Sequence, residues 1–268
     1  MKTPLDSDNG RAAFTAVELV ATLAVVTLLL MCVLASARAG SRTGGPTFQC
    51  LENTRRLVAA WLMYAADNRD TLAVNLQGSQ AQGGNYSPFV GPGWAAGWLD
   101  WTTATDNTNL HFISDKRWAS LAPYTGFTSR ILKCPADTYL SPAQIARGWT
   151  GRVRSYSLGV GLGQGNAESG PWDSIYRHLT KSIEMRYPAP AQTFVFIDED
   201  SDSINDPAFF SPSQASLMDI PAARHNGAGT MAFADGHAEI HKWAGALNPE
   251  ADIHWLSFHS QRVSEESY

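Results

Sequence analysis

The chain has 268 residues, a net charge of −5 and 44% hydrophobic residues. Its 20 Lys and Arg stand against 25 Asp and Glu. This balance argues against nucleic acid as the main partner, because phosphate neutralisation needs a concentrated basic patch. About 220 residues follow the apolar N-terminal segment, which is enough for one sizeable domain.

Residues 14–37, FTAVELVATLAVVTLLLMCVLASA, form an apolar run in which Glu18 is the single ionisable residue. As one helix they would reach about 36 Å, enough to cross a hydrocarbon core of about 30 Å. The segment has no polar face, which favours a membrane span over a core helix. It is also longer than the apolar core of a secretory signal peptide, about 7 to 15 residues. A carboxylate within such a span is costly, so Glu18 is expected either to meet a positive partner or to stay near the headgroups.

Residues 11–20, RAAFTAVELV, resemble the cleavage and methylation segment of type IV prepilins and type II secretion pseudopilins. The resemblance implies that prepilin peptidase cuts between Ala13 and Phe14 and that the new amine of Phe14 is N-methylated. It also implies that Glu18 guides assembly. An ion pair between Glu18 and the amine of a neighbouring subunit would set the register, since an unpaired charge in lipid is expensive.

The same resemblance implies how the N-terminal part is divided. Residues 1–13 are expected to be a leader peptide, and residues 14–38 a transmembrane and assembly helix. The location implied is the bacterial inner membrane, crossed once, with the domain in the periplasm or at the cell surface after assembly.

A breaker-rich hinge, AGSRTGGP at 39–46, precedes a globular domain predicted at 47–268. Gly and Pro disfavour a continuous helix, so a kink is expected within Gly40–Pro46.

A second, amphipathic helix is predicted from Thr47, as N-cap, to about Asp67. Its apolar residues recur at helical spacing, so one face is expected to lie against a sheet. Residues 50–72 also resemble the corresponding helix of a subgroup of bacterial pilin-like proteins whose chains end in a pattern of His, nine residues and Asp-Gly.

Cys50 and Cys134 lie outside the apolar segment. In an oxidising compartment they could pair, closing a loop of about 84 residues and contributing roughly 2 to 4 kcal/mol. Two free buried thiols are the alternative, because spacing alone does not fix connectivity.

Residues 73–126 are rich in Gly, Asn, Gln and Trp and show poor periodicity, so long loops are predicted. The tryptophans in this stretch are Trp94, Trp98, Trp101 and Trp118. They could stack on sugar rings or form a satellite core under the loops, and the second interpretation is favoured.

A strand predicted at 193–197, TFVFI, runs into an acidic loop. Asp198, Asp200 and Asp202 place carboxylates at alternate positions of that loop, an arrangement that suits Ca²⁺ and its 6 to 8 oxygen ligands. The spacing is not that of an EF-hand. A solvated acidic loop without metal is the alternative.

His225, Asp235 and Gly236 match the His-x9-Asp-Gly signature of the same subgroup, and residues 134–137, CPAD, resemble its CPxD segment. A direct His225–Asp235 dyad is disfavoured, because the extended residues between them span roughly 17 Å.

Asp235-Gly236 is predicted as a two-residue hairpin turn within 230–243. This register pairs Phe233 with Ala238 and Met231 with Ile240 on an apolar face. The other face would then carry His237, Glu239 and His241. It is interpreted as solvated or as a subunit contact rather than a zinc site, since successive side chains on it lie about 6.6 Å apart.

The predicted fold is therefore α+β and pilin-like, with a long membrane helix continued by the amphipathic helix on an antiparallel sheet. The predicted function is that of a structural subunit of a type IV pilus or type II secretion-like assembly. Its partners would be prepilin peptidase, other subunits and the inner membrane. An enzyme is not predicted, because no nucleophile elbow, HExxH or Walker loop occurs. The alternative is a membrane-tethered envelope protein that never polymerises and binds polysaccharide through the Trp-rich region.

Overall fold

The computed structural model describes residues 16–40, 45–84, 91–165, 177–210, 218–245 and 249–259. The chain divides into two compact units, Met1–Gly44 and Gly45–Tyr268.

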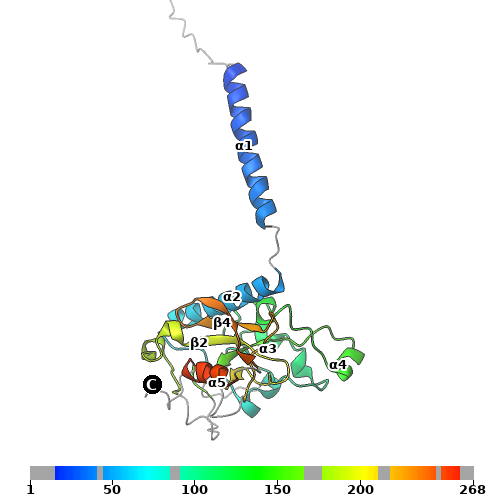
Figure 1. Ribbon diagram of the computed structural model, residues 1–268, viewed down its shortest axis with the longest axis vertical. Helices are drawn as coiled ribbons and strands as arrows, with labels where there is room; N and C mark the ends of the chain where they lie inside the picture. Colours follow the sequence, from blue (N-terminus) through cyan, green and yellow to red (C-terminus); the bar gives the residue numbers. More distant parts are fainter. Residues whose placement is uncertain are drawn as a thin grey trace, which may run out of the picture. The chain divides into compact units, whose positions relative to one another are not determined.

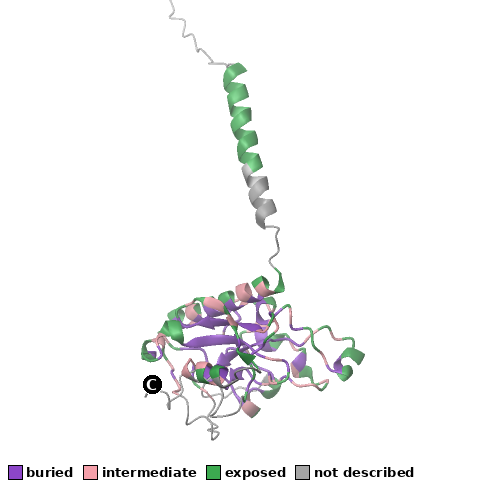
Figure 2. Ribbon diagram, in the orientation of Figure 1, coloured by how far each residue is buried: buried purple, intermediate pink, exposed green. Residues whose placement is uncertain are grey.

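The first unit contains one helix, α1 (Ala16–Gly40). Side chains are described along it as far as Met31, and all of them are exposed (Figure 2). Thr22 and Thr27 donate hydrogen bonds of 2.9 Å to the backbone carbonyls of Glu18 and Leu23. These hydroxyls are therefore satisfied within the helix itself, and the described surface of α1 is dominated by Val, Leu and Ala.

Within the described residues, no helix is both long and apolar enough to cross a membrane. This finding overturns the predicted inner-membrane location and the pilin-like fold class built on a membrane helix.

The second unit is built on a five-stranded sheet of order β3-β1-β2-β4-β5. β1 pairs with β3 in parallel, whereas the other neighbours are antiparallel. The expected purely antiparallel sheet is thus a mixed sheet. The strands are β1 (Tyr156–Gly159), β2 (Phe194–Asp198), β3 (Ala208–Phe209), β4 (Ala228–Phe233) and β5 (Ala238–Lys242).

One face of the sheet is covered by α2 (Pro46–Asp67), which crosses β2 and β4 (Figure 1). Its buried side chains follow helical spacing: Cys50, Thr54, Leu57, Val58, Ala60, Trp61 and Ala65. The predicted amphipathic helix is confirmed, although its N-cap is Gly45 rather than Thr47. Half of the predicted hinge, residues 41–44, lies outside the described residues.

The opposite face packs against α5 (Pro249–Phe258). The buried apolar side chains on this side are Phe194, Ile197, Phe209, Met231, Phe233, Trp243 and Leu256. The sheet is therefore buried on both faces, which explains why β2 and β4 are buried along their whole lengths.

The β4–β5 hairpin differs from the predicted register by one residue. Met231 pairs with Glu239 and Ala232 with Ala238, because the loop holds three residues, 234–236. Gly236 has φ +94° and donates to the Phe233 carbonyl, as in a type I turn followed by a left-handed glycine. The predicted apolar face is therefore wrong. His237 stacks on Phe233 at 4.3 Å, on the same side as Glu239 and His241.

Short helices and turns join these elements. They are α3 (His111–Ser114), α4 (Pro142–Ala146) and the 3₁₀ turns Gly78–Gln80, Gln82–Gly84, Thr105–Asn107, Arg130–Leu132, Ser182–Glu184 and Pro190–Gln192. Trp94 is buried and contacts Phe196 edge-on at 5.0 Å, while Trp118 contacts Phe112 at 5.8 Å. Trp94 is therefore part of the core, and Trp118 is half-buried against Phe112.

Candidate metal centre

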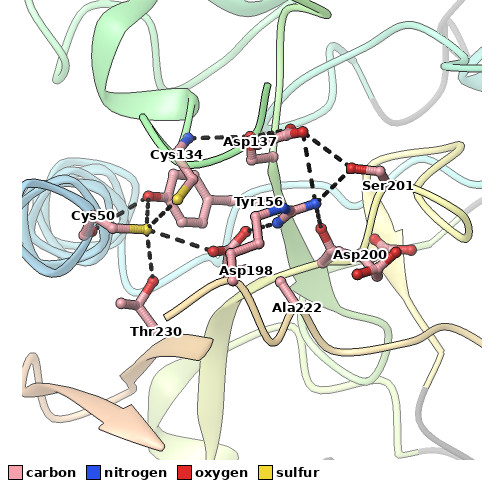
Figure 3. A network of polar contacts seen from close by, with 12 residues as sticks. Cys50, Cys134, Asp137, Tyr156, Asp198, Asp200, Ser201, Ala222 and Thr230 are labelled. Carbon is pink, nitrogen blue, oxygen red and sulfur yellow. Dashed lines mark hydrogen bonds and ion pairs between the residues drawn. The ribbon is translucent and has the colours of Figure 1, made fainter. Parts of the chain in front are cut away.

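Four side chains that can bind metals converge from four separate parts of the second unit. Cys50 lies on α2, Cys134 follows the turn Arg130–Leu132, Asp198 ends β2, and His225 precedes β4. One ligand atom from each lies within 4.8 Å of all the others, and all four residues are buried. Figure 3 shows Cys50, Cys134 and Asp198 facing one another.

Local structure explains why each side chain points to this place. Cys50 and Thr54 lie one turn apart on the buried face of α2. Asp198 is the last residue of a strand that is buried on both faces. His225 opens a tight turn in which Asn226 and Gly227 have positive φ, and its backbone N–H donates to the Ala228 carbonyl.

The distances within the group are short. The two sulfur atoms are 2.8 Å apart, too long for a covalent bond of about 2.05 Å, and both cysteines are free thiols. His225 Nε2 lies 3.4 Å from Cys134 Sγ. Asp198 Oδ2 lies 3.5 Å from Cys50 Sγ and 3.8 Å from His225 Nε2.

A ring of polar groups surrounds the four side chains. The Tyr156 hydroxyl lies 2.9 Å from Cys50 Sγ, and the Thr230 hydroxyl lies 3.3 Å from it. The Thr54 hydroxyl donates to the Cys50 carbonyl at 2.8 Å and also lies 2.9 Å from Thr230 Oγ1.

The other two side chains are held from outside the group in the same way. Arg224 Nη1 donates to Asp198 Oδ1 at 2.6 Å, so the second carboxylate oxygen, Oδ2, is turned inwards. Thr47 Oγ1 lies 3.2 Å from His225 Nδ1, so Nε2 is the ring nitrogen that faces the sulfurs.

Burial sets the protonation of these groups. It raises the pKa of Asp198 to about 6, although Arg224 acts in the opposite direction. The pKa of the Cys134 thiol is raised, mainly by its hydrogen bond with Cys50 and secondly by burial. Burial and the charge of Arg224 lower the pKa of His225, which favours a neutral imidazole able to offer a lone pair.

Arg224 also contacts a further group of polar and charged side chains around Asp137. Asp137, the last residue of the CPAD segment, accepts hydrogen bonds from Ser155 at 2.7 Å and Ser201 at 3.0 Å, and pairs with Lys133 at 2.5 Å. Arg224 Nη2 also donates to Ser201 at 2.8 Å. Figure 3 shows this network continuing from the thiols through Asp198 to Asp137.

The group has a donor set of two sulfurs, one imidazole nitrogen and one carboxylate oxygen. Those are the atoms that bind Zn²⁺ in proteins. The two thiols could instead oxidise to a disulfide. Because four side chains would fill a tetrahedral shell, a metal held here would have no open position for a substrate.

The predicted calcium ligands are not brought together. Asp198 faces the cysteines, whereas Asp200 and Asp202 line a surface cavity of about 360 Å³ beside Arg224. Asp200 Oδ1 accepts a hydrogen bond from the backbone N–H of Asp202 at 3.0 Å, which organises the turn. Among the described residues, these three carboxylates do not form a shared metal site. Calcium binding by them stays a prediction.

The remaining predicted site residues lie apart from this group. Asp235 accepts a hydrogen bond from the backbone N–H of His237 at 3.0 Å, and its Oδ1 lies 2.6 Å from Nδ1 of the His237 ring. Glu18 lies in the first turn of α1. Ala13 and Phe14, the predicted cleavage site, lie outside the described residues.

A scan against protein-family models finds no match, and comparisons with curated proteins and with solved structures find none either. The site is therefore interpreted from its own geometry. All four residues stood out in the sequence, but separately: the cysteines as a possible disulfide, Asp198 as a calcium ligand, and His225 as part of a signature. No local spacing signal joins them, because they are contributed by a helix, a loop, a strand end and a turn.

Proposed function

We propose that the chain is a structural subunit that assembles with other subunits through α1, after a prepilin-type cut between Ala13 and Phe14. The observation that carries the proposal is the exposure of large apolar side chains on every side of α1. These are Val17, Leu19, Val20, Leu23, Val25, Val26, Leu28, Leu29, Leu30 and Met31, each at least 56% exposed.

Such a helix has a strong physical reason to associate. Burying a Val, Leu or Met side chain contributes roughly 1.5 to 3 kcal/mol, and a helix that is apolar all round is normally found buried. Packing of α1 against the equivalent helices of neighbouring subunits would bury all its faces at once. The second unit has its own core and would be carried by the assembly.

The resemblance of residues 11–20 to prepilin processing segments supports the same function. Cleavage there would make Phe14 the new N-terminus and would leave Glu18 five residues into the mature chain. A buried carboxylate is stabilised by a cation, and the new amine of a neighbouring subunit would supply one. This pairing would fix the stagger between subunits.

The test is assembly of the chain in a host that expresses prepilin peptidase. Glu18→Ala is expected to abolish filaments or lower their amount at least tenfold, measured by shearing and immunoblotting. The matched control is Glu52→Ala, which removes a half-buried carboxylate of α2 that pairs with Arg55 at 2.7 Å and is expected to leave assembly unchanged. Filaments that survive Glu18→Ala in wild-type amounts would refute the proposal.

The mass of the mature N-terminus is a second, independent readout. A methylated chain that begins at Phe14 is expected from wild type. An intact Met1 would contradict the proposed processing.

A further inference from the structure

The group formed by Cys50, Cys134, Asp198 and His225 has no role in the proposed assembly through α1. We infer that it is a structural zinc site, in which Zn²⁺ fastens α2 to the sheet of the second unit.

The spacing of the ligand atoms is close to that of a tetrahedral shell. With Zn–S near 2.3 Å and Zn–N or Zn–O near 2.0 to 2.1 Å, tetrahedral geometry separates sulfur from nitrogen or oxygen by about 3.5 Å, and nitrogen from oxygen by about 3.3 Å. The structure has 3.4 Å from Cys134 Sγ to His225 Nε2 and 3.5 Å from Cys50 Sγ to Asp198 Oδ2. The distance from His225 Nε2 to Asp198 Oδ2 is 3.8 Å.

The distance between the sulfurs is the one that must change. Two sulfurs on one tetrahedral zinc lie about 3.8 Å apart. Cys50 Sγ and Cys134 Sγ are 2.8 Å apart, so zinc requires them to separate by roughly 1 Å. A rotation of the two thiol side chains within one cluster supplies a movement of this size.

The surroundings suit thiolates better than a disulfide. The Tyr156 and Thr230 hydroxyls lie 2.9 and 3.3 Å from Cys50 Sγ. A thiolate can only accept hydrogen bonds, so both hydroxyls would donate to it. Oxidation to a disulfide would remove the thiol proton that reaches the buried Asp198 Oδ2. That carboxylate oxygen would then face sulfur without a donor, at the cost of an unsatisfied buried acceptor.

Charges also balance when zinc is bound. Two thiolates and one carboxylate carry three negative charges, against two positive charges on zinc and one on Arg224, which pairs with Asp198 at 2.6 Å. His225 enters as the neutral imidazole, oriented by Thr47 at Nδ1. Outer partners of this kind are the usual support for metal ligands.

The position explains what zinc would do. α2 supplies Cys50, while the sheet and its loops supply the other three ligands, so the ion would join elements that are far apart in the sequence. With four protein ligands there is no open position, which assigns the site a structural role rather than a catalytic one.

The experiment uses the full-length chain, purified under reducing conditions, stripped with a chelator and titrated with Zn²⁺ alone. We expect one zinc per chain by elemental analysis and a rise in melting temperature. Co²⁺ in place of zinc is expected to give the visible bands of a tetrahedral site with a sulfur-to-cobalt charge-transfer band. Cys32→Ser is the matched control, because it removes the cysteine outside the site and should bind zinc as wild type does.

Cys134→Ser and His225→Gln are each expected to lower zinc affinity at least about 100-fold, because even the loss of an outer-shell partner costs about 10- to 100-fold. Thr47→Val keeps all four ligands and removes only the hydroxyl beside His225 Nδ1. We expect it to lower zinc affinity by about 10-fold or more. Its fold is checked by circular dichroism, so the test does not depend on ligand variants that unfold.

Three outcomes would overturn the inference. The first is a stripped wild-type chain that takes up no zinc and melts at the same temperature with and without it. The second is a Cys50–Cys134 disulfide found by peptide mass mapping in chain purified without reductant, with no zinc bound. The third is tight binding of copper or iron that excludes zinc. None of these outcomes bears on assembly through α1, which is tested by Glu18→Ala.

Discussion

The two units of the chain distribute polarity in opposite ways. The described residues of α1 are exposed (Figure 2). The unit Gly45–Tyr268 buries charged side chains, among them Arg154, Asp198 and Glu199, with no measurable exposure. A continuous exposed apolar surface and a buried Asp both run against the usual distribution of polarity, so each needs a specific explanation. The apolar surface of α1 calls for a partner, whereas the buried charges are largely satisfied by their own chain.

The buried charges have many partners. Arg154 donates to the Tyr156 carbonyl, the Ser157 hydroxyl and the Asn205 carbonyl at 3.1, 3.0 and 2.9 Å. The Ser157 hydroxyl in turn donates to Glu199, which also accepts from Ser203 at 2.9 Å. Loss of one member would leave its direct partners buried with one hydrogen bond fewer.

The largest expected effect comes from removing one of these charges. Arg154→Met is expected to lower the free energy of unfolding of the second unit by about 3 to 5 kcal/mol. The Tyr156 and Asn205 carbonyls would lose their donor, and buried Glu199 would lose the attraction of the arginine charge. The measurement is urea unfolding followed by tryptophan fluorescence. All nine tryptophans lie after Gly45, so this signal reports on the second unit alone.

Arg117→Met is the control for that experiment. Arg117 is paired with Asp115 at 2.5 Å, but its side chain is 70% exposed. Its removal should leave the urea midpoint unchanged. Equal effects of the two substitutions would mean that burial of the Arg154 network is not what stabilises the unit.

The sequence predicted those parts of the second unit that depend on local pattern. Helical spacing of apolar residues located α2, and β-branched and aromatic residues located β2 within one residue. The parallel partner β3 has two residues and leaves no such pattern. The hairpin register was wrong because Asp-Gly fits both a two-residue turn and the three-residue loop that forms, and one extra loop residue exchanges the faces.

The candidate metal centre shows the same limit at longer range. Cys50 and Cys134 were considered together only as a disulfide, and Asp198 was grouped with Asp200 and Asp202 because they are neighbours in sequence. Burial of β2 on both faces turns Asp198 inwards, towards His225, rather than to its neighbours. Such groupings follow from tertiary packing, which short motifs do not encode.

A second prediction concerns the pH dependence of the buried carboxyls. Burial and the nearby Asp206 raise the pKa of Asp219 from 3.8 to about 8. The folded state therefore holds a proton that the unfolded chain releases near pH 4. The contribution to stability is complete below about pH 4 and is lost as pH rises through about 8, with a slope approaching 1.4 kcal/mol per pH unit. The asparagine in Asp219→Asn cannot ionise, so this variant is expected to show a flatter dependence of stability on pH between about pH 4 and 8. The measurement is the urea midpoint at several pH values in that interval.

Asp235 supplies the opposite case. Its slight burial raises the pKa, but hydrogen bonds from His237 outweigh that effect and lower it. Its contribution is therefore present above its unfolded pKa and is lost as pH falls through the folded value. Asp235→Asn should leave the neutral-pH slope as in wild type. A profile in which Asp219→Asn also changes nothing would show that Asp219 is not the proton-binding group.

The smallest expected effect on stability lies on α1 and completes the comparison. Leu29→Gln replaces a side chain that is 60% exposed. The urea midpoint of the second unit should not move beyond the roughly 0.5 kcal/mol typical of surface substitutions. Association should weaken by about 10-fold or more, since each buried Leu contributes roughly 1.5 to 3 kcal/mol and about 1.4 kcal/mol is a factor of ten. Sedimentation of the purified chain measures the association.

Met63→Gln is the matched control for Leu29→Gln, because Met63 is a 48% exposed apolar residue on α2. It should alter neither stability nor association if α1 alone forms the contacts. Weakening by Met63→Gln but not by Leu29→Gln would place the contact surface on the second unit. The reverse result would mean that the exposed apolar surface of α1 is an interface, and that the exposed apolar residue of α2 is ordinary surface. Leu29 and Met63 are both exposed apolar residues, and the measured association would then show which of them lies in an interface.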